Sequence, residues 1–411
     1  MIKVKDALKI ILSSIKLLGA EKVSFLDGLD RVIASDIYAS CDMPPFDNSA
    51  MDGYALRAKD TKGASGTSPK ILKVIEDVAA GYTAKSRIRN NQVIRIMTGA
   101  PVPNGADSVI MVEFTKKNRD LVEIFKEARL GDNIRRLGED VRKKQKVLSR
   151  GAILRPQEIG MLASLGIARI KVAKRPRVGI LATGDELVGV EERLTKGKIR
   201  NSNSYIIHGQ ITKCGAVPVD LGIAKDIRSK VKRKIEACFK KGLDMLLGMG
   251  GISGGDYDLV KDVLLGSGME MKFWKVRQRP GKPLAFGIIK NIPVFGLPGN
   301  PVSSTVSFEE YVRPSLLKMQ GARNFFRPGV WATLTEDFKK KKPLRYFIRT
   351  RLKNIDGEFY ATITGPQGSG IISSLVLADG IIVAPEGQDL LKKGQKVYVQ
   401  LLRHGFDGGA I

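Results

Sequence analysis

The stretch Gly248-Met-Gly-Gly-Ile-Ser-Gly-Gly-Asp-Tyr-Asp258 decides how the middle of this chain folds. An apolar run over 243–247 leads into it, and a helical pattern over 259–265 follows it. Its glycines allow backbone N–H groups to turn toward a bound anion, and the N-terminus of the following helix adds partial positive charge at the same place. The stretch therefore predicts a strand, a loop and a helix that together cradle phosphate or another oxyanion.

The same residues exclude two common nucleotide-binding motifs. Ser253 stands at the third glycine position of G-x-G-x-x-G, and the chain contains no G-x-x-x-x-G-K-[ST]. An ordinary tight turn from strand to helix is the alternative interpretation. Such a turn needs fewer glycines, and the pair Asp256 and Asp258 exceeds what helix capping requires, so we favour the anion cradle.

Apolar strands alternate with helical patterns on both sides of this cradle. Strands are expected at 178–182, 217–221, 243–247, 284–289 and 293–297, and helices at 204–214, 227–240, 259–265 and 302–319. The alternation predicts a parallel, doubly wound α/β sheet. Ligands bind at the carboxyl ends of the strands in such sheets, so the polar loops that follow the strands are the candidate binding site.

The flanking parts of the chain have different patterns. Apolar residues recur at helical spacing over 4–15, and a second helix is expected over 157–166. Short β-like runs dominate 69–127 and return after residue 323, where Asn354-Ile-Asp-Gly357 predicts a hairpin turn. We therefore expect two small β-rich units, the second of them mainly structural.

The composition is that of a globular protein with several domains. The chain has 411 residues, and domains usually run about 100 to 200 residues each. Cys41, Cys214 and Cys238 are odd in number and far apart, which argues against a disulfide framework. The N-terminal helical pattern contains lysines where a signal peptide would be apolar, and no apolar run approaches the ~20 residues of a membrane span. We expect a cytoplasmic protein.

The net charge of +27 indicates anionic partners. These are either small anionic substrates or nucleic acid. The basic clusters at 142–144, 230–234 and 339–342 are scattered and lie outside any recognisable nucleic-acid motif. We interpret most of them as solvated faces and expect neither a nucleic-acid nor a membrane partner.

Seven motifs in order along the chain point to one family. They are Phe46-Asp-Asn-Ser-Ala-Met-Asp-Gly-Tyr54, Arg95-Ile-Met-Thr-Gly-Ala-Pro-Val-Pro103, Asn133-Ile-Arg-Arg-Leu-Gly-Glu-Asp140, Thr183-Gly-Asp-Glu-Leu187, the cradle, Pro280-Gly-Lys-Pro283 and Gly296-Leu-Pro-Gly-Asn-Pro301. In these motifs the chain resembles the molybdopterin molybdenumtransferases, that is, MoeA and the equivalent domain of gephyrin. The resemblance extends over essentially the whole chain.

The resemblance implies an elongated, multidomain α/β chain in four parts. Residues 1–43 with 135–172 would form a helical and extended linker domain, 44–134 a β-rich inserted domain, 173–322 the doubly wound molybdopterin-binding domain and 323–411 a C-terminal β domain. It also implies a homodimer whose site lies between the doubly wound domain of one subunit and the β-rich domain of the other. Molybdopterin adenylyltransferase and proteins that mature molybdoenzymes are possible further partners.

The family inserts molybdate into adenylated molybdopterin and releases AMP. Cleavage of a phosphoanhydride calls for a hard divalent cation held by carboxylates, so we expect Mg²⁺. The acidic residues in or beside matched motifs are the catalytic candidates: Asp52, Asp140, Glu186, Asp226 and Asp258. Glu186 and Asp258 are the expected Mg²⁺ ligands, although Asp226 and Asp258 could equally cap the helices that they precede.

The binding of phosphate and molybdate requires convergent cations and N–H donors. The cationic candidates are Arg135, Lys275, Arg279 and Lys282, and the other binding candidates from the motifs are Thr183, Gly250, Gly251, Ser253, Gly254, Gly255, Pro298 and Pro301. Two positions depart from the pattern of the family. Arg279 stands where the family often has Lys, and Asn201 stands where the family commonly has Asp. His208 lies within an expected helix and outside the motifs, so we interpret it as a packing residue.

Two other functions remain open at this point. A molybdopterin adenylyltransferase-like enzyme shares the doubly wound domain and its glycine loop, but it needs neither the 46–54 motif nor the β-rich additions. A non-catalytic scaffold or anion-binding protein is the other alternative, because gephyrin clusters receptors. The chain has no long linker or second enzymatic domain in support of a scaffold.

Overall fold

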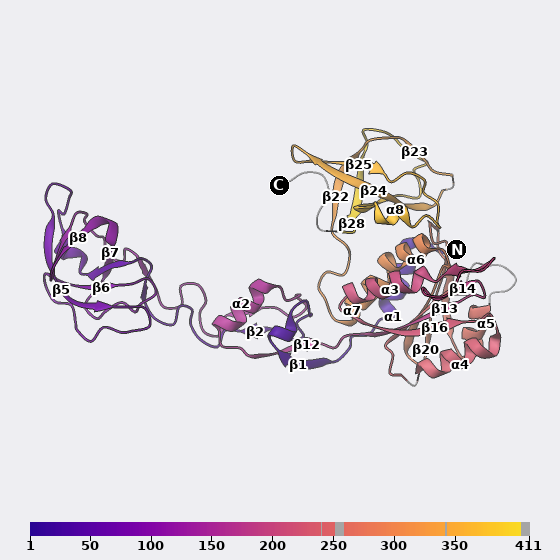
Figure 1. Ribbon diagram of the computed structural model, residues 1–411, viewed down its shortest axis with the longest axis horizontal. Helices are drawn as coiled ribbons and strands as arrows, with labels where there is room; N and C mark the ends of the chain where they lie inside the picture. Colours follow the sequence, from indigo (N-terminus) through magenta and orange to yellow (C-terminus); the bar gives the residue numbers. More distant parts are fainter. Residues whose placement is uncertain (240, 251–258, 342, 404–411) are drawn as a thin grey trace.

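The computed structural model describes residues 1–239, 241–250, 259–341 and 343–403. The chain is elongated (Figure 1). A β-rich part lies at one end, a small part with helix α2 (Pro156–Ser164) lies in the middle, and an α/β part lies with the C-terminal β part at the other end. None of the helices in these described ranges is long and apolar enough to cross a membrane.

The chain passes through the middle part twice. Strand β1 (Ala20–Ser24) pairs antiparallel with β12 (Arg169–Ala173), and β2 (Ile37–Tyr38) pairs with β11 (Lys146–Leu148). A short 3-10 turn, η1 (Leu26–Gly28), follows β1. The buried residues of this part come from both passages and include Ile33, Leu162 and Val172. The two segments of the chain therefore pack against each other around one small core, and the β-rich part extends from this core.

The β-rich part is one six-stranded sheet in the order β7-β4-β6-β5-β9-β8. Its strands are β4 (Gly53–Leu56), β5 (Lys70–Val78), β6 (Gln92–Ile96), β7 (Ser108–Met111), β8 (Thr115–Asn118) and β9 (Leu121–Ile124). A further pair, β3 (Asn48–Ser49) with β10 (Ile134–Arg135), and the 3-10 turns η2 (Ala58–Thr61) and η3 (Val112–Phe114) complete it. The prediction of short strands over 69–127 is confirmed.

The α/β part is built on a second six-stranded sheet, in the order β16-β13-β17-β21-β20-β18. Its strands are β13 (Arg177–Thr183), β16 (Val217–Ala224), β17 (Met245–Met249), β18 (Glu270–Lys275), β20 (Pro283–Ile289) and β21 (Ile292–Leu297). A short pair, β14 (Leu187–Val188) with β15 (Ile199–Arg200), lies beside it. The five expected strands are all present, and β18 is an addition.

The sheet is not parallel throughout, which corrects one expectation. Strands β16, β13, β17 and β21 are parallel, whereas β20 and β18 run antiparallel to their neighbours. The cause lies in the turn between β20 and β21, where Lys290 and Asn291 have φ of 47° and 68°. Two successive positive φ values are typical of the tight turn of a β-hairpin, so the chain reverses there instead of crossing over through a helix.

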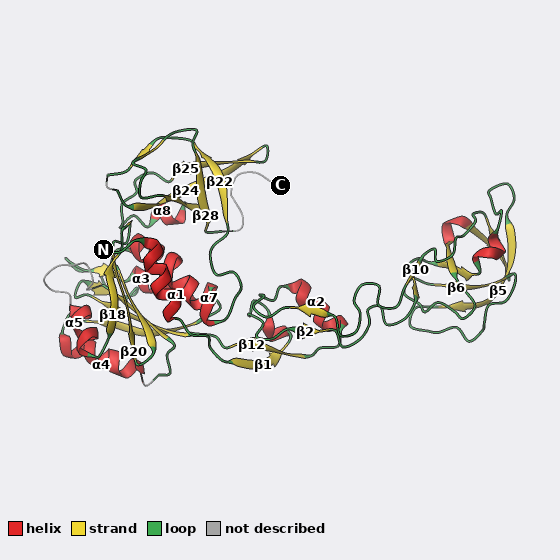
Figure 2. Ribbon diagram, turned by 180° about the vertical axis from the view of Figure 1, so that it is seen from behind, coloured by secondary structure: helices red, strands yellow, loops and turns green. Residues whose placement is uncertain are grey.

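Helices cover both faces of this sheet (Figures 1 and 2). They are α1 (Val4–Ser14), α3 (Ser202–Lys213), α4 (Arg228–Phe239), α5 (Leu259–Gly266), α6 (Pro301–Ser307) and α7 (Arg313–Met319). Ile180 belongs to the core that includes residues of α1, α3, α6 and α7, and its neighbour Leu181 belongs to the core that includes residues of α4 and α5. Adjacent residues of a strand point to opposite faces, so this is the expected doubly wound arrangement.

Helix α1 belongs to the α/β part although it is far from it in the sequence. The backbone N–H of Ile2 donates to the carbonyl of Lys275, and the Lys318 ammonium donates to the carbonyl of Leu12 on α1. Val4, Ala7 and Ile11 are buried on the inner face of this helix. The helical periodicity over 4–15 therefore identifies a helix that closes one face of the distant sheet.

The C-terminal β part contributes five strands to a further six-stranded sheet, in the order β19-β24-β25-β22-β28-β26, and an extra pairing of β24 with β26 closes these five. Its elements are β22 (Gly329–Leu334), β23 (Phe338–Lys339), β24 (Arg345–Ile355), β25 (Glu358–Ile363), α8 (Ser373–Val376), β26 (Gly380–Ala384), β27 (Leu390–Leu391) and β28 (Lys396–Leu401). The expected hairpin between β24 and β25 is present, with Asp356 and Gly357 at positive φ. Strand β19 (Gln278–Arg279) of the α/β part pairs with β24 and ties the two parts together.

The helix expected over 302–319 contains a π-helical turn, Phe308–Val312, between α6 and α7. This turn places two adjacent carboxylates at the junction with the C-terminal β part. Glu309 forms an ion pair with Arg327 at 2.7 Å, and Glu310 is buried next to Gln400 of β28. Burial, together with the neighbouring Glu309 carboxylate, raises the pKa of Glu310 to about 8.

This buried carboxyl predicts a pH-dependent stability. Its pKa in the folded chain is above its ordinary value of 4.5, so its contribution to folding is present in full below that value and is lost as the pH rises to about 8. Glu310→Gln keeps a neutral hydrogen-bonding side chain. We expect the melting temperature of the variant to exceed that of the wild type increasingly between about pH 5 and about pH 8.5. A difference that does not change with pH contradicts this, and the exposed Glu113→Gln is the control.

Candidate active site

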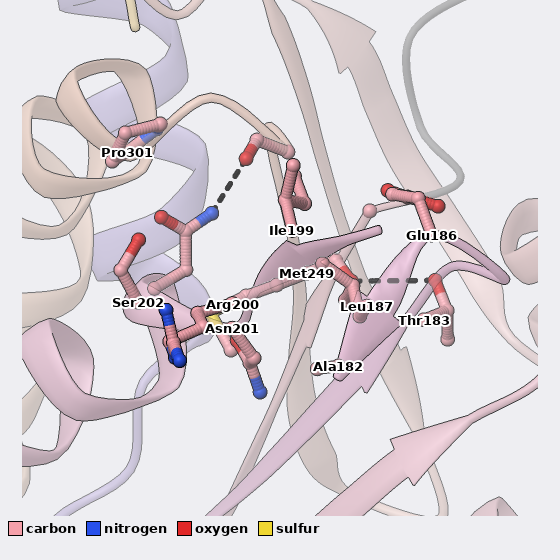
Figure 3. A pocket seen from close by; sticks show the side chains of 13 residues that line it. Ala182, Thr183, Glu186, Leu187, Ile199, Arg200, Asn201, Ser202, Met249 and Pro301 are labelled. Atoms are coloured by element: carbon pink, nitrogen blue, oxygen red, sulfur yellow. Dashed lines mark hydrogen bonds between the residues drawn. The ribbon is translucent and has the colours of Figure 1, made fainter. Parts of the chain in front are cut away.

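The carboxyl ends of the parallel strands form the expected binding edge. Strand β13 ends at Thr183 and its neighbour β17 ends at Met249, and the Thr183 hydroxyl donates to the Met249 carbonyl at 3.3 Å. Figure 3 shows these two residues beside Glu186, with Pro301 at the start of α6 on the other side. Thr183, Gly250, Glu186 and Pro301, all predicted from the sequence, line one cavity here.

This central cavity measures about 80 Å³. Its walls come from the ends of β13 and β17, the β14–β15 pair, the N-terminus of α3 and the loop before α6, and the lining residues are Ala182, Thr183, Glu186, Leu187, Ile199, Arg200, Asn201, Ser202, Asn203, Met249, Gly250, Gly299 and Pro301. Asn203 donates to the carbonyl of Gly299 at 2.6 Å, while its Oδ1 is buried without a hydrogen-bond partner. Arg200 is a cation in this wall that the motifs did not indicate.

Position 250 has no room for any residue other than glycine. Its φ is +89°, and a Cβ atom there would lie 2.3 Å from the Thr183 carbonyl oxygen. Both facts exclude a side chain, since L-residues rarely adopt such a φ and the contact is too short. The remaining cradle residues, Gly251, Ser253, Gly254, Gly255 and Asp258, lie outside the described residues.

Two acidic loops meet next to the central cavity. Asp226 follows β16, and its backbone N–H donates to the Asp185 carboxylate at 3.3 Å. Burial raises the pKa of Asp226, and the negative charges of Asp185 and Glu186 raise it further. Carboxylates that destabilise one another's charge favour a cation between them, and carboxylate oxygens are the ligands that Mg²⁺ prefers.

The donor chemistry of this cluster therefore fits Mg²⁺. Within the described ranges, no group of three or more His, Cys, Asp or Glu side chains is placed to hold a metal by itself. The second expected ligand, Asp258, lies beyond those ranges. Glu186, the other expected Mg²⁺ ligand, lines the central cavity.

A second cavity, of about 340 Å³, holds the predicted cations Arg279 and Lys282. We refer to it as the cationic cavity; it is lined by Met1, Gln278, Arg279, Pro280, Gly281, Lys282, Pro283, Asn300, Ser303, Leu344, Gln367 and Ser369. Arg279 also lies over the ring of Tyr346, 5.7 Å from its centroid. Pro298 belongs to the loop between β21 and α6, and this loop separates the cationic cavity from the central one.

The C-terminal β part contributes Leu344, Gln367 and Ser369 to this cavity, and none of the seven sequence motifs includes them. Ser369 accepts a hydrogen bond at 3.1 Å from the backbone N–H of Val302 on α6. The buried Arg349 donates to the Gly368 carbonyl at 3.0 Å, and its backbone N–H donates to Gln367 at 2.9 Å. The glycine-rich loop 365–370 was the available signal, because such loops bring backbone close to ligands.

Lys275 and His208 lie elsewhere than expected. Lys275 ends β18 and lines neither the central nor the cationic cavity; its ammonium lies 4.8 Å from the centroid of the Trp274 ring. The expectation that His208 packs inside is wrong, because it is exposed on α3. Asn201, which departs from the family, caps this helix by accepting from the Ser204 N–H at 3.3 Å.

Three predicted residues lie in or next to the β-rich part of the molecule. The carboxylate of Asp52 accepts hydrogen bonds from the Thr98 N–H and hydroxyl, each at 2.7 Å, and these bonds lower the pKa of Asp52. Arg135, on β10, and Asp140 are both exposed. Figures 1 and 2 show the β-rich part and β10 far from the sheet that carries the central cavity. One chain alone therefore does not bring these residues to Thr183 and Glu186.

Three family models match the chain in succession. The MoeA N-terminal region (domain I and II) matches residues 2–166, the probable molybdopterin binding domain matches 179–318, and the MoeA C-terminal region (domain IV) matches 332–402. These matches include the three parts of the chain that provide the candidate residues.

Curated proteins and solved structures are similar over nearly the whole length. A molybdopterin molybdenumtransferase of Bacillus subtilis (strain 168) is 35% identical over 387 residues, which cover 93% of this chain and 90% of that protein. One of Staphylococcus aureus (strain COL) is 35% identical over 404 residues, covering 97% and 95%. The crystal structure of a molybdopterin biosynthesis moeA protein from Pyrococcus horikoshii OT3 is 34% identical, with a TM-score of 0.85 over 98% of this chain and 100% of that one.

Proposed function

The chain belongs to the molybdopterin molybdenumtransferase (MoeA) family, and from this premise we propose that it inserts molybdate into adenylated molybdopterin with bound Mg²⁺ and with release of AMP. It is a transferase of molybdenum cofactor biosynthesis, since relatives of that name match it at 35% identity along nearly its whole length. The observation that supports the detailed reaction is the position of the cationic cavity next to the central cavity, across the 298–301 loop.

The cationic cavity suits molybdate. Molybdate is a tetrahedral dianion, and Arg279 and Lys282 place two cations in one cavity, beside the polar side chains of Ser303, Gln367 and Ser369. Charge-assisted hydrogen bonds from such groups are about twice as strong as neutral ones. We assign molybdate binding to this cavity, with Arg349 as a positioning residue that holds the 365–370 loop.

The central cavity suits the phosphates of the adenylated substrate. Gly250 begins the glycine loop at the end of β17, where backbone N–H groups can bind an anion. Arg200 adds a cation to the same wall. Glu186 and Asp258 would hold Mg²⁺, which when bound neutralises the charge that develops as the phosphoanhydride bond breaks.

We further propose that the complete site is shared between two copies of this chain. Asp52 precedes β4 and Arg135 lies on β10, both in the β-rich part at the other end of the elongated molecule, and Asp140 follows β10. A second copy can therefore supply them to the central cavity in a closed two-fold dimer. A cytoplasmic location and contacts with molybdopterin adenylyltransferase and with proteins that mature molybdoenzymes also belong to this proposal.

The direct test is AMP release from molybdopterin adenylate by the purified protein. Molybdate and Mg²⁺ are each supplied or omitted, which gives four conditions. We expect AMP only when both are present. Bound adenylate without AMP in all four conditions contradicts the reaction and favours a carrier or scaffold.

Replacement of Lys282 tests the assignment of the cationic cavity. Loss of one charge-assisted hydrogen bond weakens binding by about ten- to hundred-fold, so Lys282→Ala should raise the molybdate concentration for half-maximal AMP release by that factor. Lys282→Arg should restore part of the loss, because it keeps the charge. Lys213→Ala, at an exposed lysine at the end of α3, is the control. An unchanged molybdate requirement in Lys282→Ala shows that Lys282 has no part in binding.

A further inference from the structure

The turn that carries the two cations of the cationic cavity has to hold like charges side by side. Arg279 and Lys282 both line this cavity, and only two residues separate them in the chain. Like charges at such a spacing repel each other, and long side chains lose rotamer freedom when they are fixed in one place. The Val276 N–H closes the turn by donating to the Lys282 carbonyl at 3.0 Å. Binding of one small anion by both cations calls for further groups that fix the turn in advance.

Gln278 is the buried side chain behind this turn. It is fully buried, it lines the cationic cavity, and its Nε2 donates to the Pro280 carbonyl at 3.2 Å. Gly281 has a φ of +86°, and a Cβ atom there would lie 2.7 Å from Gln278 Nε2 and 2.7 Å from Ser307 Oγ. The backbone of the turn therefore packs directly on the amide of Gln278.

Tyr311 in turn fixes this amide. It is fully buried in the π-helical turn, and its hydroxyl is hydrogen-bonded to Gln278 Oε1. The Pro280 carbonyl can only accept, so the Nε2 end of the amide faces Pro280 and the Oε1 end faces Tyr311. The phenol is therefore the donor. Its hydroxyl, the amide and the carbonyl form one directed chain of hydrogen bonds that ends on the turn.

The π-helical turn also connects this chain to the opposite wall of the cavity. Helix α6 supplies Ser303 to the cationic cavity and continues directly into the π-helical turn that carries Tyr311. The hydrogen bond from Tyr311 to Gln278 therefore sets the distance between the wall from α6 and the turn with the cations. Turns of this helical type are rare and are frequent at functional sites. Neither Tyr311 nor Gln278 belongs to the seven sequence motifs.

We propose that Tyr311 and Gln278 are positioning residues for molybdate. Their hydrogen-bond chain to the Pro280 carbonyl holds the turn in the geometry in which Arg279 and Lys282 bind the dianion together. Tyr311 does not line the cationic cavity, so it acts on the anion through Gln278. This assignment rests on the proposed function, which gives the cavity its ligand.

The test compares the wild type with Tyr311→Phe, Gln278→Met and the double variant. Tyr311→Phe removes only the hydroxyl, and Gln278→Met keeps about the same length without the amide. Loss of a buried hydrogen bond that leaves its partner unpaired weakens binding by about ten-fold, so each single variant should need about ten-fold more molybdate for half-maximal AMP release. Both substitutions break the same chain, so their effects should not add. The double variant should also need about ten-fold more molybdate, not about hundred-fold more.

Two further readouts distinguish positioning from a general loss of stability. The adenylate concentration for half-maximal AMP release, measured at saturating molybdate, should not change, because the central cavity lies across the 298–301 loop. Hydrogen exchange of segment 277–284 should be faster in all three variants, because the turn is held less firmly.

Thr61→Val is the matched control. It deletes a fully buried hydroxyl that donates to the Ala58 carbonyl at 2.7 Å in the β-rich part. It should lower the melting temperature and leave both the molybdate requirement and the exchange of segment 277–284 unchanged. If Gln278→Met does not fold, Tyr311→Phe decides alone, since it removes a single oxygen atom.

Three results would overturn the proposal. They are an unchanged molybdate requirement in Tyr311→Phe, a double variant that needs about hundred-fold more molybdate, and an adenylate requirement that rises together with the molybdate requirement. With a wild type that releases AMP, each of these leaves the proposed function standing. A wild type that releases no AMP contradicts the proposed function. Faster exchange of segment 277–284 in the variants then still supports the hold of Tyr311 and Gln278 on the turn, and unchanged exchange contradicts it.

Discussion

A heterodimer that combines an Asp52→Ala subunit with a Gly250→Ala subunit is expected to release AMP at about half the wild-type rate, whereas each variant alone is expected to be inactive. The reason is that Asp52 adjoins β4 of the β-rich part and Gly250 adjoins β17 of the α/β part, and these two parts lie at opposite ends of the molecule. If two copies share each site across a two-fold axis, one of the two sites in this heterodimer contains both native residues. The other site contains both substitutions.

The matched control places both substitutions in one subunit and pairs it with a wild-type subunit. Each shared site then contains one substitution, so this heterodimer should be inactive. Two different affinity tags allow each heterodimer to be purified free of homodimers. A site built from a single chain predicts the reverse, namely an inactive first heterodimer and a half-active control, and that result would refute the shared site.

The second large effect is expected from Gly250→Ala alone. The new methyl group would lie 2.3 Å from the Thr183 carbonyl oxygen, so the end of β17 or of β13 must move. Displacement of a reacting group by about 1 Å can cost about a hundred-fold in rate, and we expect a loss of AMP release of at least that size. Binding of the adenylate should weaken as well, because the glycine loop starts at this residue.

Gly357→Ala separates this effect from backbone strain. Gly357 has a φ of +85°, close to that of Gly250, but no heavy atom lies within 4 Å of its added Cβ. It stands in the β24–β25 hairpin. Both variants should lose some thermal stability, and only Gly250→Ala should lose activity. Full activity in Gly250→Ala would exclude the end of β17 from the site.

Most of the α/β part could be predicted from residue patterns, and its antiparallel edge could not. The strands β13, β16 and β17 are apolar runs separated by helical periodicity, which is a strong local signal. Strand β18 has the sequence Glu-Met-Lys-Phe-Trp-Lys, in which half of the residues are charged. The hairpin turn at Lys290 and Asn291 lacks the Asn-Gly pair that usually marks such turns. Both features depend on contacts with the neighbouring strand.

The residues of the candidate site also fall into two groups, those that could be predicted from the sequence and those that could not. Thr183, Glu186 and Gly250 could be found because they belong to matched motifs at the carboxyl ends of strands of one sheet, where ligands bind. Gln367 and Ser369 were missed, because the glycine-rich loop 365–370 does not by itself show which other part of the chain it meets; in the structure, β19 pairs with β24 and Ser369 bonds to Val302 of α6. No local pattern encodes such a contact between two parts of the chain.

The docking of α1 sets a time scale for folding during synthesis. The Leu12 carbonyl accepts its hydrogen bond from Lys318, 306 residues further along the chain. A ribosome adds about 5 to 20 residues per second, so α1 leaves the ribosome roughly 15 to 60 seconds before its partner helix α7 exists. Its apolar face, with Val4, Ala7 and Ile11, stays exposed to other proteins during that interval. The α/β part is therefore completed after translation of the middle and β-rich parts, and until α7 emerges the apolar face of α1 is open to the aggregation that chaperones prevent.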